Sequence, residues 1–159
     1  MTVARFEHVS TAQYARDMQL PGAMMVEDIP LPRRATRGSA GYDFTCPAEV
    51  TLAPGAQAIV PTGIRVRIEP GWVLLNVPRS SLGRRHGIRL ANTVGVIDSD
   101  YYGADNEGHI LVMLVHGGDH AVTIGRGERF CQGILVPFGL AEEEDVAGVR
   151  SGGFGSTGA

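Results

Sequence analysis

The sequence predicts an all-β fold with little helix, and three observations lead to this prediction. Glycine makes up 22 of the 159 residues, well above its usual share of about 7%, which indicates many tight turns. Several short apolar runs are rich in β-branched residues, as strands are. Turn dipeptides separate these runs at short intervals, a spacing typical of a distorted β-barrel or a jelly-roll-like sandwich.

The predicted elements follow one another in a simple order. Residues 1–20 open with a short apolar stretch around Phe6 and Val9, for which we expect one strand, and continue as a weakly helical arm. Pro21 and Gly22 mark a turn. Beyond them the pattern is β, and the clearest strand candidates are residues 56–68, 71–77, 109–115 and 130–138.

Helix is expected at one place in the body of the chain, a single short turn over residues 80–86 that Ser80 is able to cap. The sequence contains no internal repeat and no linker-like boundary, so we predict one domain. We expect residues 1–20 to form an N-terminal arm, residues 21–140 the β domain, and residues 141–159 a flexible C-terminal arm. Residues 151–159 are too rich in glycine and serine to pack into a core.

Charge and composition narrow the function classes. A net charge of −3 gives no general affinity for nucleic acid, which needs a basic surface, although a small anion can still bind in a locally positive pocket. No apolar run approaches the roughly 18 residues of a membrane span, and the N-terminus does not resemble a signal peptide. We expect Cys46 and Cys131 to be reduced thiols and the protein to be cytoplasmic.

Four segments in the body of the chain carry side chains of chemical interest. Asp43 stands close to Gly41 near a strand start, where a simple turn aspartate is the better interpretation of the pattern by itself. Arg79 and Ser80 follow a buried strand and open the helical turn. Backbone N–H groups there, with an arginine beside them, suit phosphate; plain helix capping is the alternative. A third segment contains Gln132, which borders an apolar strand and by itself gives little indication of function.

The fourth segment, residues 92–103, places two acids and two tyrosines directly after an apolar pair. An acid at such a junction, with a tyrosine next to it, is suited to activating water or packing against a sugar. A hairpin with solvated acids explains the same pattern. A fifth segment lies in the tail, where Phe154 is flanked by glycines, with Arg150 before it and Ser156 and Thr157 after it.

The histidines were considered as metal ligands. His116, Asp119 and His120 lie close together in the sequence, but they flank a Gly-Gly turn, so their side chains need not converge. The chain has no CxxC or HExxH motif.

Taken together, the five segments resemble, in their order and spacing along the chain, those of the trimeric dUTP diphosphatase (dUTPase) family. The resemblance extends from about Ile29 to the C-terminus. It implies a β-clip barrel that assembles as a homotrimer. It also implies Mg²⁺-dependent hydrolysis of dUTP to dUMP and pyrophosphate, which keeps uracil out of DNA and supplies dUMP for dTMP synthesis. In this family each site draws residues from all three subunits, so a monomer should be inactive.

The resemblance also implies roles for individual residues. Asp98 would be the general base that activates water, and Tyr101 would pack under the deoxyribose and exclude a 2′-hydroxyl. Asp43 would reach Mg²⁺ only through water, since the triphosphate itself would chelate the ion. The remaining substrate-binding residues fall into three groups: Asn92, Val96 and Ile97 at the uracil; Arg79, Ser80, Ser81 and Gln132 at the phosphates; and Arg150, Phe154, Gly155, Ser156 and Thr157 in the closing tail.

The sequence departs from the usual family pattern in four places. Ser81 replaces a common glycine, and Cys131 replaces a common alanine. Residues 104–107 form a small insertion. Arg150 stands four residues before Phe154, where five is commoner, so its role is the least secure.

Two rival functions remain open at this point. A dCTP deaminase shares the fold and a related Arg-Ser-Ser motif, but it needs a glutamate on the strand after the substrate hairpin, where this chain has Met113. A non-catalytic regulatory trimer is the second rival. Residues 1–20 and 104–107 are where we would expect its partner surface.

Overall fold

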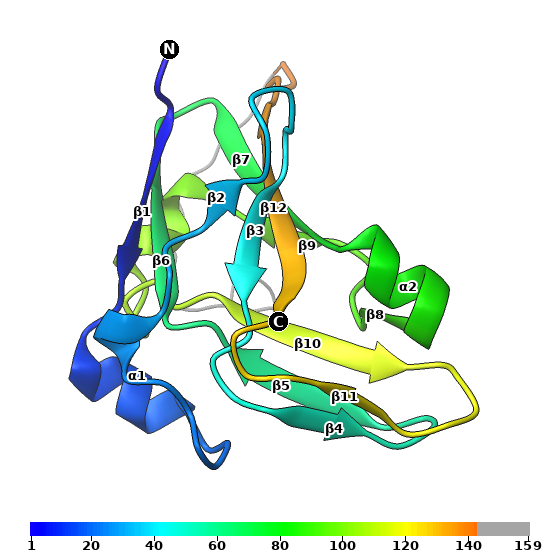
Figure 1. The fold of residues 1–159 in the computed structure, drawn as a ribbon. Helices are drawn as coiled ribbons and strands as arrows, with labels where there is room; N and C mark the ends of the chain where they lie inside the picture. The colour runs from blue at the N-terminus through cyan, green and yellow to red at the C-terminus, as the bar shows by residue number, and fades with distance from the viewer. Residues whose placement is uncertain (143–159) are drawn as a thin grey trace.

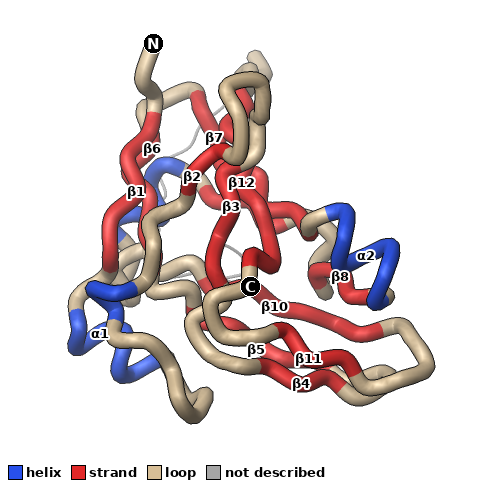
Figure 2. Tube along the Cα trace, in the orientation of Figure 1, coloured by secondary structure: helices blue, strands red, loops and turns tan. Residues whose placement is uncertain are grey.

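The computed structural model describes residues 1–142 of the chain, and strands dominate it (Figures 1 and 2). The largest sheet has five strands in the order β2-β3-β12-β7-β9. Their bounds are Arg33–Arg34 for β2, Tyr42–Thr45 for β3, Arg129–Pro137 for β12, Trp72–Pro78 for β7 and Gly95–Ile97 for β9. Every neighbouring pair in this sheet is antiparallel. The prediction of an all-β fold is confirmed.

Three smaller sheets complete the strands described in residues 1–142. They have the orders β5-β10-β8, β11-β4 and β1-β6, and their pairs are also antiparallel. The sheets remain separate, so the barrel is distorted and open rather than closed. The strand bounds are Ala4–His8 (β1), Val50–Leu52 (β4), Gln57–Pro61 (β5), Ile64–Ile68 (β6), Ile88–Leu90 (β8), Leu111–His116 (β10) and Val122–Ile124 (β11).

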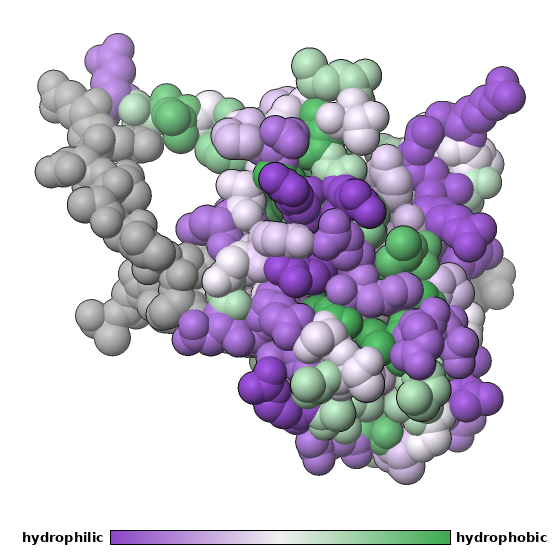
Figure 3. Space-filling model, turned by 90° about the vertical axis from the view of Figure 1, so that its left-hand side faces the viewer, coloured by the Kyte–Doolittle hydropathy of each residue, from purple (hydrophilic) through white to green (hydrophobic). Residues whose placement is uncertain are grey.

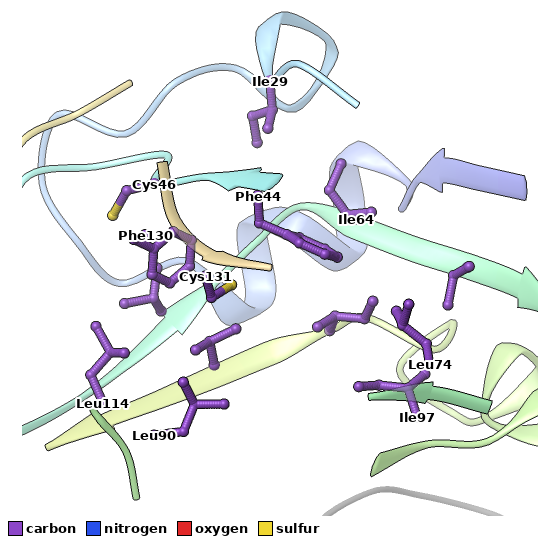
Figure 4. Packing of buried hydrophobic residues seen from close by; sticks show 14 of the residues in the cluster. Ile29, Phe44, Cys46, Ile64, Leu74, Leu90, Ile97, Leu114, Phe130 and Cys131 are labelled. Atoms are coloured by element: carbon purple, nitrogen blue, oxygen red, sulfur yellow. The ribbon is translucent and has the colours of Figure 1, made fainter. Parts of the chain in front are cut away.

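One hydrophobic core joins the sheets. Phe44 of β3, Leu74 of β7 and Phe130 of β12 are almost completely buried, and Figure 4 shows their side chains within one interior with those of the neighbouring sheets. Cys46 and Cys131 are both buried and free in this core. Burial raises the pKa of the Cys46 thiol to about 11, so both the packing and the chemistry are those of unreactive core thiols.

The first 20 residues, expected as an arm with one strand, contain a strand and a helix that pack on the domain. Strand β1 pairs with β6 along its whole length. Helix α1 (Thr11–Asp17) begins after Ser10, whose hydroxyl accepts the N–H of Gln13 as an N-cap. Tyr14 of α1 is buried in the main core. A 3₁₀ helix η1 (Val26–Asp28) follows.

The predicted helical turn over residues 80–86 is helix α2 (Ser80–His86). The cap prediction was wrong: the helix is capped at Arg79, without a side-chain hydrogen bond, and Ser80 is its first residue. Gly87 ends the helix in a left-handed conformation with φ of 64°, as C-terminal glycines commonly do. None of the helices within residues 1–142 is long and apolar enough to cross a membrane.

Candidate functional site

Two groups of residues, which include most of the predicted site residues in the described part of the chain, lie at the two ends of strand β7. The first, which we name the Asp43 cluster, contains Asp43, Arg79, Arg129 and Gln132. Asp43 of β3 and Gln132 of β12 are directly opposite each other across the sheet. Arg79 follows β7 two residues after Val77, which is the partner of Gln132 on its other side. Because alternate residues of a strand share a face, these side chains gather on one face of the sheet.

The Asp43 carboxylate is held by two guanidinium groups. Arg79 Nε lies 3.0 Å from Asp43 Oδ1, and Arg129 Nη1 lies 3.1 Å from Oδ2. The Asp43 side chain is 9% exposed, while those of Arg79 and Arg129 are 28% and 53% exposed. Charge-assisted hydrogen bonds of this kind fix the direction of a guanidinium group. The arrangement therefore presents two oriented, partly exposed cations at the edge of the sheet. Arg129 was not among the predicted site residues.

A glycine makes room for the Gln132 amide. A Cβ on Gly41 would lie 2.1 Å from Gln132 Oε1, far inside van der Waals contact. The Gln132 side chain therefore rests directly on the Gly41 backbone, and its Nε2 is 3.5 Å from the Pro78 carbonyl. Gly41 thus lets Gln132 lie between the ends of β3 and β7.

Ser80 and Ser81 are exposed in the first turn of α2. The Arg79 carbonyl accepts the N–H groups of Leu82 and Gly83 at 3.0 and 3.4 Å. Leu82 is buried and anchors the turn in the core. Both hydroxyls are therefore available to a ligand beside the Asp43 cluster.

The second group, which we name the Asp98 segment, comprises residues 95–103. Strand β9 pairs with β7 and ends at Ile97. Asp98 is the N-cap of the 3₁₀ helix η2 (Ser99–Gly103), and its carbonyl accepts the Tyr101 N–H at 3.2 Å. Val96 is 59% exposed and Ile97 is buried, because consecutive strand residues face opposite sides. The Asp98 side chain is half-buried.

Tyr101 is held firmly. Its hydroxyl donates to the His109 carbonyl at 2.8 Å and accepts from Asn106 Nδ2 at 2.8 Å. The residue is only 7% exposed and belongs to the core. With one end of the phenol bonded and the ring packed, Tyr101 is a rigid surface next to Asp98.

The turn before β9 differs from the expected hairpin. Strand β8 pairs with β10, whereas β9 pairs with β7, so the two strands beside this turn belong to different sheets. Asn92 is exposed at the turn, and Thr93 takes a positive φ of 65°. Val94 N–H donates to the Asn92 carbonyl at 2.7 Å, which makes the turn very tight. Gly95 lies against Asn76 of β7.

The Asp98 segment and the Asp43 cluster are far apart within one chain. The pairing of Leu74 with Ile97 puts Asp98 beside Val73, near the start of β7, whereas Arg79 follows the end of that strand. The extended backbone from Val73 to Arg79 spans about 20 Å at roughly 3.3 Å per residue. In Figure 1, α2 is on the right and β6, against which η2 packs, is on the left.

The described histidines, cysteines and acids do not converge on a metal site. Within residues 1–142, no group of three or more His, Cys, Asp and Glu side chains is placed to hold an ion. His116 Nε2 donates to the His120 carbonyl at 2.6 Å, and its Nδ1 accepts from Gly118 N–H at 3.4 Å. Both ring nitrogens of His116 are thus used within the turn, which accounts for the histidine pattern in the sequence.

The tail residues expected to close over a substrate lie outside the described residues. They are Arg150, Phe154, Gly155, Ser156 and Thr157.

This chain is similar to known members of the dUTPase family. A dUTPase family model matches residues 27–158. The deoxyuridine 5′-triphosphate nucleotidohydrolase of Lactococcus lactis subsp. lactis is 45% identical over 134 residues, which cover 82% of this chain and 89% of the relative. The dUTPase of Streptococcus mutans has a similar crystal structure, with 36% identity, a TM-score of 0.69 and coverage of 86% of this chain and 98% of its own.

A more distant structure agrees in fold. It is a mutant dUTPase from phage phi11 of S. aureus, described for its coordination of a structural Mg(II) ion. Its TM-score is 0.69 at 18% identity, over 92% of this chain and 98% of its own.

Proposed function

The chain belongs to the dUTPase family, and from this premise we propose that it hydrolyses dUTP to dUMP and pyrophosphate at a site shared between subunits. The observation that carries the proposal is the Asp98 segment, in which a half-buried aspartate stands three residues before a tyrosine held by two hydrogen bonds. A carboxylate beside a rigid packing surface is suited to orienting water against a bound nucleotide.

Asp98 is the general base in this proposal. Its carboxylate accepts a proton from a water molecule while the water oxygen forms a bond to the α-phosphorus. The bond between that phosphorus and the oxygen bridging to the β-phosphorus breaks, and pyrophosphate leaves with that oxygen. The proton on Asp98 then returns to solvent. The chain's contribution is therefore mainly the position of the water and the substrate.

The nucleoside would lie on the Asp98 segment. Tyr101 packs under the deoxyribose, and its fixed ring leaves no space for a 2′-hydroxyl. Asn92 and the backbone of residues 92–98 bind uracil, with Val96 as the apolar wall. The Ile97 side chain is buried on the opposite face, so Ile97 contributes through its backbone alone. The exposure of Val96 and the tightness of the Asn92 turn support this role, because a rigid turn excludes a larger base by steric conflict.

The triphosphate would lie on the Asp43 cluster. Arg79, Ser80, Ser81 and Gln132 contact phosphate oxygens, and the exposed part of Arg129 adds a second cation. Pairing with Asp43 supports this role, because it fixes the direction of both guanidinium groups before a ligand arrives.

Mg²⁺ would enter as part of the substrate, chelated by the triphosphate. The surroundings of Asp43 fit this arrangement. Both Asp43 oxygens are engaged by arginines, so Asp43 would reach the ion only through water. Bound in this way, the ion neutralises phosphate charge.

The separation of the two groups supports a homotrimer with shared sites. The Asp98 segment of one chain would meet the Asp43 cluster of a second chain, and the tail of the third would close over them, with Phe154 on the uracil and Arg150, Gly155, Ser156 and Thr157 on the phosphates. Closure would expel water and strengthen the charge contacts. The buried free thiols support a reducing, cytoplasmic location.

The first experiment measures pyrophosphate release from dUTP, with dCTP, dTTP and UTP in parallel, with and without Mg²⁺. The proposal predicts rapid release from dUTP alone, and only with Mg²⁺. Ammonia release from dCTP would instead identify a deaminase, and no reaction with any nucleotide would indicate a non-catalytic trimer. The first result is favoured because β10 carries Met113 rather than a glutamate.

Replacement of the base separates chemistry from binding. Asp98→Asn keeps the size and most of the polarity of the side chain but cannot take the proton. Turnover should fall by at least about 100-fold, while dUTP binding and assembly measured by calorimetry and sedimentation stay the same. Turnover close to that of the unmodified protein would exclude Asp98 as the base.

A further inference from the structure

The N-terminal residues 4–17, which we name the N-terminal segment, precede the region matched by the dUTPase family model. They nevertheless hold residues 101–109, which follow the proposed catalytic base. The Tyr102 hydroxyl donates to Glu7 at 2.7 Å. The backbone N–H and the hydroxyl of Ser10 donate to the Glu107 carboxylate at 2.8 and 2.6 Å. Residues 104–107, identified as an insertion, therefore contact the N-terminal segment.

A third contact lies deeper in the protein. His109 Nδ1 is 2.5 Å from Asp17 Oδ2, and Asp17 also accepts from Gln13 Nε2 at 2.7 Å. The other ring nitrogen, His109 Nε2, is 2.8 Å from the backbone nitrogen of Gly63. His109 is completely buried, so its ring joins helix α1 to the turn between β5 and β6.

The partners determine the protonation of this ring. A backbone N–H can only donate, so Nε2 must accept from Gly63 and carries no proton. The proton is then on Nδ1, which donates to Asp17. Burial lowers the pKa of His109, against the opposing effects of Asp17 and Glu107. The neutral Nδ1–H form is therefore the one that fits all contacts. The His109 ring also lies near the ring of Tyr14 in α1, with the two ring centroids 6.2 Å apart.

The backbone of the same histidine holds Tyr101. The His109 carbonyl accepts the Tyr101 hydroxyl, and Asn106 Nδ2 bonds that hydroxyl in turn. The ring and this carbonyl belong to one residue, so the contacts of the ring constrain the backbone that carries the carbonyl. The position of Tyr101 thus depends on a contact that reaches, through one residue, to the end of helix α1.

We propose that Asp17 and His109 are positioning residues for dUTP hydrolysis, which fix Tyr101 and through it the selection of deoxyribose. This inference rests on the function proposed above. Neither residue contacts the substrate. Their effect is on the geometry of the sugar site, so their loss should reduce discrimination against UTP in addition to turnover. The face that carries the N-terminal segment is mainly hydrophilic (Figure 3).

The test compares Asp17→Ala, Asp17→Asn and Thr11→Ala. Thr11→Ala is the control, because Thr11 is exposed on the same helix. For each variant, kcat and KM are measured with dUTP and with UTP, and folding is checked by thermal unfolding. Asp17→Ala should lower the ratio of kcat/KM for dUTP over UTP by about tenfold or more, since small displacements in a site have large effects on rate. Asp17→Asn, which still accepts a hydrogen bond, should recover most of the ratio.

A folded Asp17→Ala protein with an unchanged ratio would overturn the proposal. If that variant does not fold, the unmodified protein still provides a test. Nitrogen-15 spectra of labelled histidine distinguish the two neutral tautomers, and His109 should be in the Nδ1–H form at pH 7. An Nε2–H or doubly protonated ring would contradict the proposed hydrogen bond from His109 Nδ1 to Asp17 and so overturn the proposal. Absence of dUTP hydrolysis by the unmodified protein would instead refute the proposed function and leave the tautomer result standing.

Discussion

Replacement of Gly108 by alanine gives a direct test of how the Asp98 segment is packed. Gly108 has a positive φ of 71°, and a Cβ there would lie 2.6 Å from the Tyr101 carbonyl oxygen and 2.8 Å from Tyr102 Cα. Both contacts are with backbone, which cannot rotate away as a side chain can. The substitution therefore forces either local strain or a movement of the segment that carries Tyr101.

Gly55→Ala is a matched control for the stability lost in Gly108→Ala. Gly55 has a similar φ of 76°, but a Cβ there would meet nothing within 4 Å. A left-handed conformation costs alanine about 1–2 kcal/mol, and the reduced entropy of the unfolded chain offsets about 0.4–1 kcal/mol of this. Gly55→Ala should therefore lose about 1 kcal/mol. Gly108→Ala adds a packing conflict of about 1–3 kcal/mol.

The assay is urea unfolding of both variants at one protein concentration, since assembly contributes to stability. Gly108→Ala should lower the free energy of unfolding by about 1–3 kcal/mol more than Gly55→Ala, and it alone should reduce dUTP turnover. If the two variants lose the same free energy of unfolding, within about 0.5 kcal/mol, Gly108 does not pack closely against Tyr101.

Two further predictions concern Gly41 and His109. Gly41→Ala should displace the Gln132 amide and raise the KM for dUTP severalfold. Little stability should be lost, because only the end of a flexible side chain must move. Unchanged steady-state kinetics would contradict the proposed role of Gln132. His109 has a folded-state pKa below its ordinary value of 6.5, so the unfolded chain takes up the proton first. Its contribution to stability should be complete above pH 6.5 and be lost as the pH falls through the lowered value. Urea unfolding between pH 7.5 and 5 measures this, and the loss should persist in His120→Asn, which removes an exposed histidine.

The sequence predicted the strands and the second helix well because their signals are local. The apolar run over residues 71–77 is bounded by Pro-Gly on one side and proline on the other, and it corresponds to β7 (Trp72–Pro78). The run over 109–115 corresponds to β10 (Leu111–His116), although His109 itself is a buried polar contact rather than part of the strand. Periodicity and turn residues are sufficient for such assignments.

Contacts between distant residues could not be predicted in this way. Asp43 and Arg129 are 86 positions apart, and His109 and Asp17 are 92 apart. Nothing in the residues around them indicates either pairing. The Ser80 cap failed for a different reason, since a serine is equally acceptable as the first helical residue, and one residue decides between the two positions.

The order of the motifs in the sequence also does not show how far apart they lie in the folded chain. Arg79 and Asp98 are 19 residues apart in the sequence, and the antiparallel pairing of β9 with β7 places them at opposite ends of a strand. The sharing of sites between chains was implied by the family resemblance. The strand register, which separates Asp98 from Arg79 within one chain, supports the proposal of shared sites.

The most direct test of the shared site mixes two inactive variants, Asp98→Asn and Arg79→Ala. Each is purified alone, shown to be folded and inactive, and then unfolded and refolded with the other in equal amounts. If the Asp98 segment and the Asp43 cluster of one site come from different chains, random assembly in a closed symmetric oligomer restores both groups in about a quarter of the sites. Recovery of about that fraction of dUTP turnover is the predicted result. A mixture that stays inactive, while mass spectrometry confirms mixed oligomers, would show that one chain supplies both groups and would contradict the account.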